Sequence, residues 1–188
     1  PSVSSFATTF DKIQIYSSAL VKIIRGFLLS ITTPHAKPLI ILERHVQIKN
    51  RQQIHVEAKV KFEDYCEIQN YDEWALFWKA VTIGRSFQIK PISYYGVGHI
   101  GYGFSIGENS SIGLGEFIGC AGKVKIDKNV LIGPNVTIIA EKHHFWSLNK
   151  SIREQGAYQK GIFIYDDVWI GTNVTILEGV TIASGTVI

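Results

Sequence analysis

The apolar residues in the C-terminal half of the chain recur at intervals of six. Isoleucines stand six residues apart within each of three groups. These are Ile100, Ile106, Ile112 and Ile118; then Ile126, Ile132 and Ile138; then Ile164, Ile170, Ile176, Ile182 and Ile188. A period of six fits neither an α-helix nor a long strand, but it fits short strands joined by corners that repeat identically. The pattern therefore predicts a solenoid with a column of isoleucines in its core.

The residues around these isoleucines follow the same period. A second small or β-branched residue often stands two positions earlier, as in Val130 and Ile132, and a glycine often follows, as in IGPN and IGTN. We expect the glycines and asparagines to supply the unusual backbone angles of the corners. Weaker copies such as Val46 and Ile48 extend the pattern toward the N-terminus, so the solenoid is expected to begin near Leu39.

The N-terminal segment, residues 1–38, is expected to hold one amphipathic helix and a linker before the solenoid domain of residues 39–188. Its apolar residues fall at helical spacings, with the basic residues mostly on the other side. They are Phe10, Ile13, Leu20, Ile24, Phe27 and Leu28. No run reaches the roughly 18 uncharged residues of a spanning helix, so this segment is expected not to cross a membrane. The pattern leaves two interpretations open: a cap packed on the solenoid, or contact with a membrane surface or a lipid-linked substrate.

The composition of the chain narrows the classes of function that the protein could have. The chain has 188 residues, of which 46% are apolar, which is enough for one domain with its own core. The net charge of +3 comes without clusters of Lys and Arg, so we expect no nucleic-acid partner. The only cysteines are Cys66 and Cys120, and no cleavable signal is recognised, so we expect reduced thiols and a cytoplasmic location. Within the cytoplasm, the inner face of the membrane is the alternative location.

Three segments interrupt the rhythm. Residues 69–82 and 90–99 are aromatic, and residues 139–161 form the longest gap. Function on a solenoid is carried by what projects from it, so the longest gap predicts a protruding loop with a functional role. It contains the cluster HHFW, from His143 to Trp146.

The two most regular blocks carry a resemblance to a known family. IDKNVLIGPNVTI at 126–138 and IYDDVWIGTNVTILEGVTIASGTVI at 164–188 resemble the hexapeptide-repeat acyltransferases, in particular the sugar O-acetyltransferases of capsule, exopolysaccharide and O-antigen biosynthesis. The resemblance implies an all-β solenoid, a left-handed parallel β-helix with three strands per turn. It also implies a homotrimer with active sites between subunits, acetyl-CoA as the donor, no metal, and at least one more coil after Ile188.

The resemblance also implies site residues in the protruding loop. In the family a histidine on this loop is the general base, and AEKHHF places it at His143, with His144 as the adjacent position. A sugar hydroxyl is too weak an acid to ionise at neutral pH, so its attack on a thioester needs such a base. Glu141 or a backbone carbonyl is the candidate for holding the second ring nitrogen.

Further loop residues are candidates for the acceptor site. Trp146 would either face the sugar or the pantetheine arm of the donor, or only pin the loop. Arg153, Gln155 and Gly156 match an IRxQG segment of the similar enzymes and would shape the loop or bind the acceptor, with a surface salt bridge as the simpler interpretation of Arg153.

For the donor, the resemblance implies a groove lined by Trp169, Gly171 and Thr172, where an extended pantetheine lies close to the backbone. The simpler interpretation of Trp169 is aromatic packing at a corner. Cys120 could in principle form an acyl-enzyme, but the family transfers the acetyl group directly in a ternary complex.

The leading hypothesis is therefore O-acetylation of a carbohydrate acceptor, either a polysaccharide or a lipid-linked saccharide. One alternative is N-acetylation of a nucleotide-linked amino sugar. A second is a zinc-dependent β-helix like a carbonic anhydrase, which needs three imidazoles; beyond the pair in the loop, the chain has only His35, His45, His55 and His99. A purely structural solenoid would need neither the HHFW cluster nor Trp169.

Overall fold

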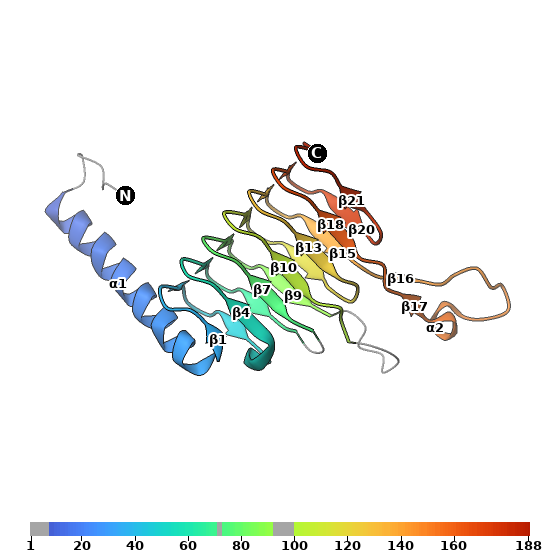
Figure 1. Ribbon diagram of the computed structural model, residues 1–188, viewed down its shortest axis with the longest axis horizontal. Helices are drawn as coiled ribbons and strands as arrows, with labels where there is room; N and C mark the ends of the chain where they lie inside the picture. The colour runs from blue at the N-terminus through green and yellow to red at the C-terminus, as the bar shows by residue number, and fades with distance from the viewer. Residues whose placement is uncertain (1–7, 71–72, 92–99) are drawn as a thin grey trace.

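The computed structural model describes residues 8–70, 73–91 and 100–188, and it shows one long helix followed by a three-sided parallel β-helix (Figure 1). The first sheet contains β1 (His35–Ala36), β4 (Ile54–Val56), β7 (Ala75–Phe77), β10 (Phe104–Ile106), β13 (Val124–Ile126), β18 (Ile162–Ile164) and β21 (Thr181–Ile182). The second contains β2 (Ile41–Leu42), β5 (Lys61–Phe62), β8 (Thr82–Ile83), β11 (Ser111–Ile112), β14 (Leu131–Ile132) and β19 (Trp169–Ile170). The third contains β3 (Gln47–Ile48), β6 (Glu67–Ile68), β9 (Gln88–Lys90), β12 (Phe117–Gly119), β15 (Thr137–Ile139) and β20 (Thr175–Leu177). The predicted solenoid is confirmed, and it begins at His35, slightly before the expected Leu39.

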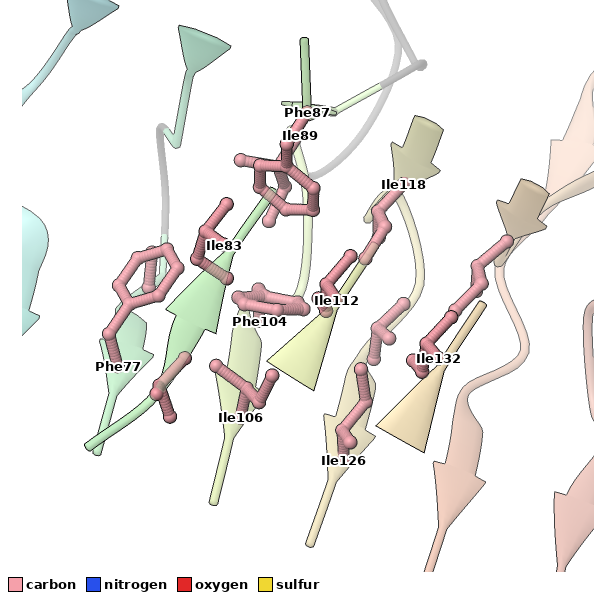
Figure 2. Close-up of a cluster of buried hydrophobic side chains, with 14 of the residues drawn as sticks. Phe77, Ile83, Phe87, Ile89, Phe104, Ile106, Ile112, Ile118, Ile126 and Ile132 are labelled. Atoms are coloured by element: carbon pink, nitrogen blue, oxygen red, sulfur yellow. The ribbon is translucent and has the colours of Figure 1, made fainter. Parts of the chain in front are cut away.

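The core is the predicted column of isoleucines. Strands of successive coils pair in parallel with equivalent residues opposite each other, such as Ile106 with Ile126 and Ile112 with Ile132. Figure 2 shows these side chains stacked inside the coils, with aromatic residues such as Phe77 and Phe104 filling the N-terminal part. The column is shorter than the sequence predicts, because Ile100 and Ile188 are 37% and 48% exposed and lie outside the core.

The corners confirm the prediction for asparagine and for part of the glycines. Left-handed backbone angles occur at non-glycine corner residues such as Asn129 and Asn135, with φ of 59° and 58°. Gly115 takes the same role at its corner, with φ of 79°. Several glycines that directly follow an isoleucine instead serve close packing, as Gly84 does. A Cβ on Gly84 would lie 1.6 Å from the carbonyl oxygen of Gly113 in the next coil. Glycine is therefore needed at Gly84 because two backbones approach, whereas the corner angles are supplied by asparagine and glycine at other positions.

Helix α1 (Thr9–Thr32) begins at a capping box in which the Thr8 hydroxyl and the Asp11 carboxylate bond each other's backbone amides. Its C-terminal part contacts β1 and β2, and only Gly26 and Leu29 are buried. The interpretation of α1 as a packed cap is therefore wrong for most of its length. By length and composition α1 is able to cross a membrane, so the count of uncharged residues does not by itself exclude a spanning helix.

All the long interruptions leave the β-helix at one edge, where the third sheet turns into the first. The short helix η1 (Arg51–Gln53) lies there, as do the connections 69–74, 91–103 and 140–161. Figure 1 shows the segment 140–161 projecting from this edge of the solenoid. Parts of the two aromatic insertions, residues 71–72 and 92–99, lie outside the described residues. Stacking of coils thus brings segments far apart in the sequence to one edge.

The core contains a carboxyl group, that of Glu116, at a position that is apolar in most other coils. Glu116 stands two residues before Ile118, is 2% exposed, and neither of its side-chain oxygens has a hydrogen-bond partner among the described residues. Burial raises the pKa of Glu116 to about 7 from its usual 4.5, because the charged form loses its hydration. Between about pH 4.5 and pH 7 the folded protein therefore keeps a proton on Glu116 that the unfolded chain has released.

We expect the free energy of unfolding to fall as the pH rises, because Glu116 then loses this proton inside the core. The contribution of protonated Glu116 is complete below about pH 4.5 and is lost as the pH rises through about 7. In Glu116→Gln this loss, up to about 3 kcal/mol, should disappear. Urea denaturation at several pH values measures it, and equal pH dependence in both proteins would contradict the assignment.

Candidate functional site

The protruding loop, residues 140–161, is an ordered hairpin. Strands β16 (Lys142–His143) and β17 (Ala157–Tyr158) pair antiparallel, with His143 opposite Ala157. Helix α2 (Ile152–Gln155) follows a capping box between Ser151 and Glu154. The sequence bounds of 139–161 need one change, since Ile139 still belongs to β15. The loop therefore holds its histidines on a short strand pair with defined geometry.

The two histidines of the loop have different surroundings. His143 is exposed on β16, whereas His144 is half-buried. The His144 ring accepts a hydrogen bond at Nδ1 from the Trp146 indole N–H at 3.3 Å and lies 5.2 Å from the Tyr158 ring centroid. Accepting at Nδ1 leaves the proton of a neutral ring on Nε2. His144 is thus engaged in packing, and His143 presents its ring to whatever approaches the loop.

Trp146 is held inside the loop as well as exposed. Its ring stacks at 4.2 Å on Phe145, and the ammonium group of Lys142 lies 5.9 Å from the Trp146 ring centroid and 5.3 Å from that of Phe145. These distances are typical of cation–π contacts. At the same time 66% of Trp146 remains exposed. Both expectations for Trp146 are thus compatible, because the ring is pinned on one side and open on the other.

The base of the hairpin is fastened to the β-helix through Glu178. The Tyr158 hydroxyl donates to the Glu178 carboxylate at 3.2 Å, and the Lys142 ammonium lies 3.7 Å from the same oxygen. Sequence reasoning did not identify Tyr158, Lys142 or Glu178. Their partners are about twenty or more residues away in sequence, so no local pattern marks them.

Gln155 shapes the loop. Its side chain donates to the carbonyls of Ser147 and Lys150 at 3.1 and 3.0 Å, and it accepts from the Ser147 amide at 2.9 Å. Arg153 is exposed on α2, and Glu141 is 9% exposed at the start of the loop. Gly156 ends α2 with φ of 74°, an angle that favours glycine. The roles of Arg153 and Glu141 stay predictions.

The expected donor residues lie on a different side of the prism. Trp169 is the first residue of β19 in the second sheet, so its expected place at a corner is wrong. Trp169 is 55% exposed. In the pair of β14 and β19 it lies opposite Leu131, which is 53% exposed. Thr172 donates to the Pro134 carbonyl at 2.8 Å, and a Cβ on Gly171 would lie 3.1 Å from the Ile188 carbonyl oxygen. Within one chain these residues form an apolar surface separate from the protruding loop.

The thiol of Cys120 is unsuited to nucleophilic attack. The residue is completely buried, and burial raises the pKa of Cys120 to about 12, because a thiolate there would lose its hydration. An acyl-enzyme at Cys120 is therefore not supported. Within residues 8–70, 73–91 and 100–188, no group of three His, Cys, Asp or Glu side chains could hold a metal ion; His99 lies outside these ranges.

A groove on the first sheet runs toward the loop, and sequence reasoning did not assign it. About 610 Å³ in volume, it is lined by aromatic and basic side chains. They include His35, His55, Trp74, Trp78, Tyr102 and Lys123. A second hollow of about 300 Å³ shares Tyr102 and Lys123 with it and ends at Gln159, Gly161 and Phe163 at the base of the loop.

Two tryptophans define the groove. Trp74 and Trp78 flank β7 and are each 41% exposed. The Trp74 ring meets His35 edge-on at a centroid distance of 4.8 Å, and Trp78 lies 5.9 Å from His55. The groove, which we call the aromatic groove, thus offers flat apolar surfaces beside hydrogen-bonding and cationic groups. The signal in the sequence was the aromatic content of residues 69–82, but the partners come from other coils.

No protein-family model matches the chain. It is 35% identical over 111 residues to the galactoside O-acetyltransferase of Escherichia coli, covering 57% of this chain and 50% of that protein. It is 31% identical over 109 residues to the galactoside O-acetyltransferase of Lactococcus lactis, covering 56% and 49%. The chain thus spans about half the length of these two relatives.

Two further comparisons concern acetyltransferases. A Saccharomyces cerevisiae protein named "Putative acetyltransferase YJL218W" is 33% identical over 143 residues, covering 72% of this chain and 68% of that protein. A solved hexapeptide-repeat acetyltransferase from Vibrio cholerae, complexed with acetyl-CoA, is 28% identical, covers 59% of this chain and 55% of that chain, and superposes with a TM-score of 0.48. Given the six-residue repeat, the three-sided β-helix and the length of the match to the yeast relative, the chain belongs to the hexapeptide-repeat acetyltransferase family.

Proposed function

We propose that the protein is an acetyl-CoA-dependent O-acetyltransferase acting on a carbohydrate hydroxyl. The observation that carries the proposal is the protruding loop, which presents His143 exposed beside the Phe145 and Trp146 pair, and at whose base the second hollow ends. In this role His143 takes the proton from the hydroxyl as its oxygen attacks the thioester carbonyl, and coenzyme A leaves as the thiol. Relatives named galactoside O-acetyltransferase support a sugar as the acceptor.

The acceptor would lie in the aromatic groove. Indole rings stack on the apolar faces of sugar rings, while imidazole and ammonium groups bond the hydroxyls around the rim. The groove is longer than one sugar ring needs, since it continues into the second hollow up to Gly161. We therefore favour a saccharide of several units, such as a capsular, exopolysaccharide or O-antigen chain, as the acceptor.

The donor would lie along the exposed strip formed by Trp169 and Leu131. Because this strip and the loop occupy different sides of one chain, the proposal includes a homotrimer in which the loop of one subunit reaches the strip of the next. Acetyl transfer within the cytoplasm follows from the location of acetyl-CoA.

One panel tests the function. Protein is incubated with radiolabelled acetyl-CoA and, separately, with polysaccharides, lipid-linked oligosaccharides, simple glycosides and nucleotide-linked amino sugars. Base-labile label on a saccharide supports O-acetylation. Label that resists mild base and appears only on amino sugars would establish the alternative, N-acetylation. Absence of transfer to every acceptor, with coenzyme A release no faster than in buffer, would overturn the proposal.

The aromatic groove predicts a dependence on acceptor length. In Trp74→Ala or Trp78→Ala the KM for an oligosaccharide should rise roughly tenfold, because one stacking surface is lost, while the KM for acetyl-CoA stays unchanged. Steady-state kinetics with acceptors of increasing length measure this. Tyr65→Ala is the matched control, since Tyr65 is exposed and stacks on His45 outside the groove. An equal effect of all three variants would contradict the groove as the acceptor site.

A further inference from the structure

Helix α1 turns its polar side toward the β-helix. Lys22 pairs with Glu43 at 2.5 Å, and Arg25 lies with Glu43 and Arg44 in the hollow between the helix and the first coil. The closest approach is at Gly26, where a Cβ would lie 1.8 Å from the Ile40 carbonyl oxygen. Leu29 is the one large apolar side chain of α1 that is buried. An ordinary amphipathic helix of a globular domain has the reverse arrangement.

The apolar side of α1 therefore has no cover from the described part of the chain. Its large side chains are each about 40% exposed or more. They are Phe10, Ile13, Ile15, Tyr16, Leu20, Val21, Ile23, Ile24, Phe27, Leu28 and Ile31. Figure 1 shows the N-terminal part of α1 projecting beyond the first coil. Leaving this much apolar surface in water costs about 25 cal/mol for each Å², so the surface is that of a binding element.

A basic hollow lies where α1 joins the β-helix. It has a volume of about 490 Å³ and is lined by Arg25, Arg44 and Arg51 together with Leu28. Arg51 is held in place by a hydrogen bond of 2.7 Å from its guanidinium group to the Thr32 hydroxyl. The acidic residue of the hollow, Glu43, is already paired with Lys22. Guanidinium groups in such a cluster bind phosphate oxygens, and here they do so next to an apolar surface.

The shape of the apolar side favours a bilayer over a second copy of the chain. A helix that pairs with another helix needs a narrow stripe at two positions in seven. On α1 the apolar residues fill a much broader face, which includes the aromatic residues Phe10, Tyr16 and Phe27. A broad apolar face with aromatic residues beside basic groups is typical of helices that lie in the membrane interface.

A helix lying on the membrane also agrees better with the contacts than one that spans it. Lys22 and Arg25 are fixed against the first coil, which contacts the C-terminal part of α1 through β1 and β2. A spanning orientation would draw these charges and their partners toward the hydrocarbon, at a high cost in free energy. Lying flat, α1 buries its apolar side and leaves the charges at the phosphate level.

We propose that α1 docks the protein on an anionic bilayer, with its apolar side in the interface and with Arg25, Arg44 and Arg51 on lipid phosphates. The first coil then lies next to the membrane. The aromatic groove starts at this coil, at His35, and leads away from the membrane toward the protruding loop. This inference goes beyond the proposed function and does not depend on it.

Vesicle sedimentation tests the docking. The full chain should bind vesicles of phosphatidylglycerol and phosphatidylcholine more tightly than pure phosphatidylcholine vesicles, and added salt should weaken binding. Leu20→Glu with Phe27→Glu should abolish binding, and Arg44→Gln should lower affinity about fivefold, the effect of one basic residue at such a surface. Circular dichroism checks that each variant remains folded.

Leu148→Glu is the matched control, because Leu148 is fully exposed on the protruding loop and far from α1 in sequence. It should bind vesicles like the unchanged protein. Equal binding of the Leu20 and Phe27 variant would overturn the proposal. Absence of vesicle binding by the unchanged protein would also overturn it. If the Leu20 and Phe27 variant then forms a smaller oligomer than the unchanged protein, a second copy of the chain covers α1. Transfer to a water-soluble acceptor should be the same in the Leu20 and Phe27 variant and in Arg44→Gln as in the unchanged protein, so a failure of docking is distinguishable from a failure of the proposed function.

Discussion

Replacing His143 by alanine should lower kcat about 100-fold or more while leaving the affinity for acetyl-CoA nearly unchanged. The reason is that a sugar hydroxyl cannot lose its proton before attack at neutral pH, and a positioned base typically contributes a factor of this size. The proposed donor strip is formed by Trp169 and Leu131 and does not include His143, so removal of the imidazole should leave these donor contacts in place. Transfer of radiolabelled acetyl groups gives kcat, and isothermal titration gives the dissociation constant of acetyl-CoA.

His45→Ala is the control for this result. His45 stacks on Tyr65 at 4.6 Å, away from the loop, and its loss should leave kcat unchanged. His144→Ala separates the two loop histidines: it removes the partner of Trp146 and so should raise the KM for the acceptor more than it lowers kcat. Undiminished transfer by His143→Ala would show that another group is the base.

Replacing Ile106 by alanine should lower the free energy of unfolding by about 2–5 kcal/mol, the usual range for a truncated core isoleucine. Ile106 has no exposed surface and lies in register between Phe77 and Ile126 of the neighbouring coils. Because each coil contacts only its neighbours, the cavity weakens two interfaces between coils at once. Urea denaturation followed by circular dichroism measures the effect.

The control for the core prediction is Leu148→Ala. Leu148 is fully exposed in the protruding loop, so its truncation should change the free energy of unfolding by less than about 0.5 kcal/mol. A similar small change for Ile106→Ala would mean that the isoleucine column contributes little to stability, contrary to the register of the strands.

The period of six was sufficient to predict the β-helix because each coil buries the same positions. An isoleucine opposite its equivalent in the next coil, such as Ile112 against Ile132, repeats one local contact along the chain. Deviations from the period were equally informative: the gap after Ile138 correctly located the protruding loop. The role of the glycines was predicted only in part: Gly115 supplies a positive φ at a corner, whereas Gly84 is needed for space. The sequence does not distinguish these two requirements.

Only part of the candidate functional site could be predicted from the sequence. His143, His144 and Trp146 are close in sequence, so their grouping could be predicted from the interruption alone. Trp74, Tyr102 and Lys123 meet in one groove only because their connections leave the β-helix at the same edge. The tether of the loop to Glu178 likewise joins neighbouring coils.

What the sequence by itself determined is everything that depends on local repetition: the strands, the core column, the loop with its histidines and the amphipathic character of α1. Periodicity reports which residues share a face. It does not report what that face meets. The tertiary structure alone decided that the insertions align on one edge, that Trp169 faces away from the loop, and that α1 turns Lys22 and Arg25 inward. The physical reason is that burial is a property of pairs of surfaces, and the partner surface of each lies elsewhere in the chain or outside it.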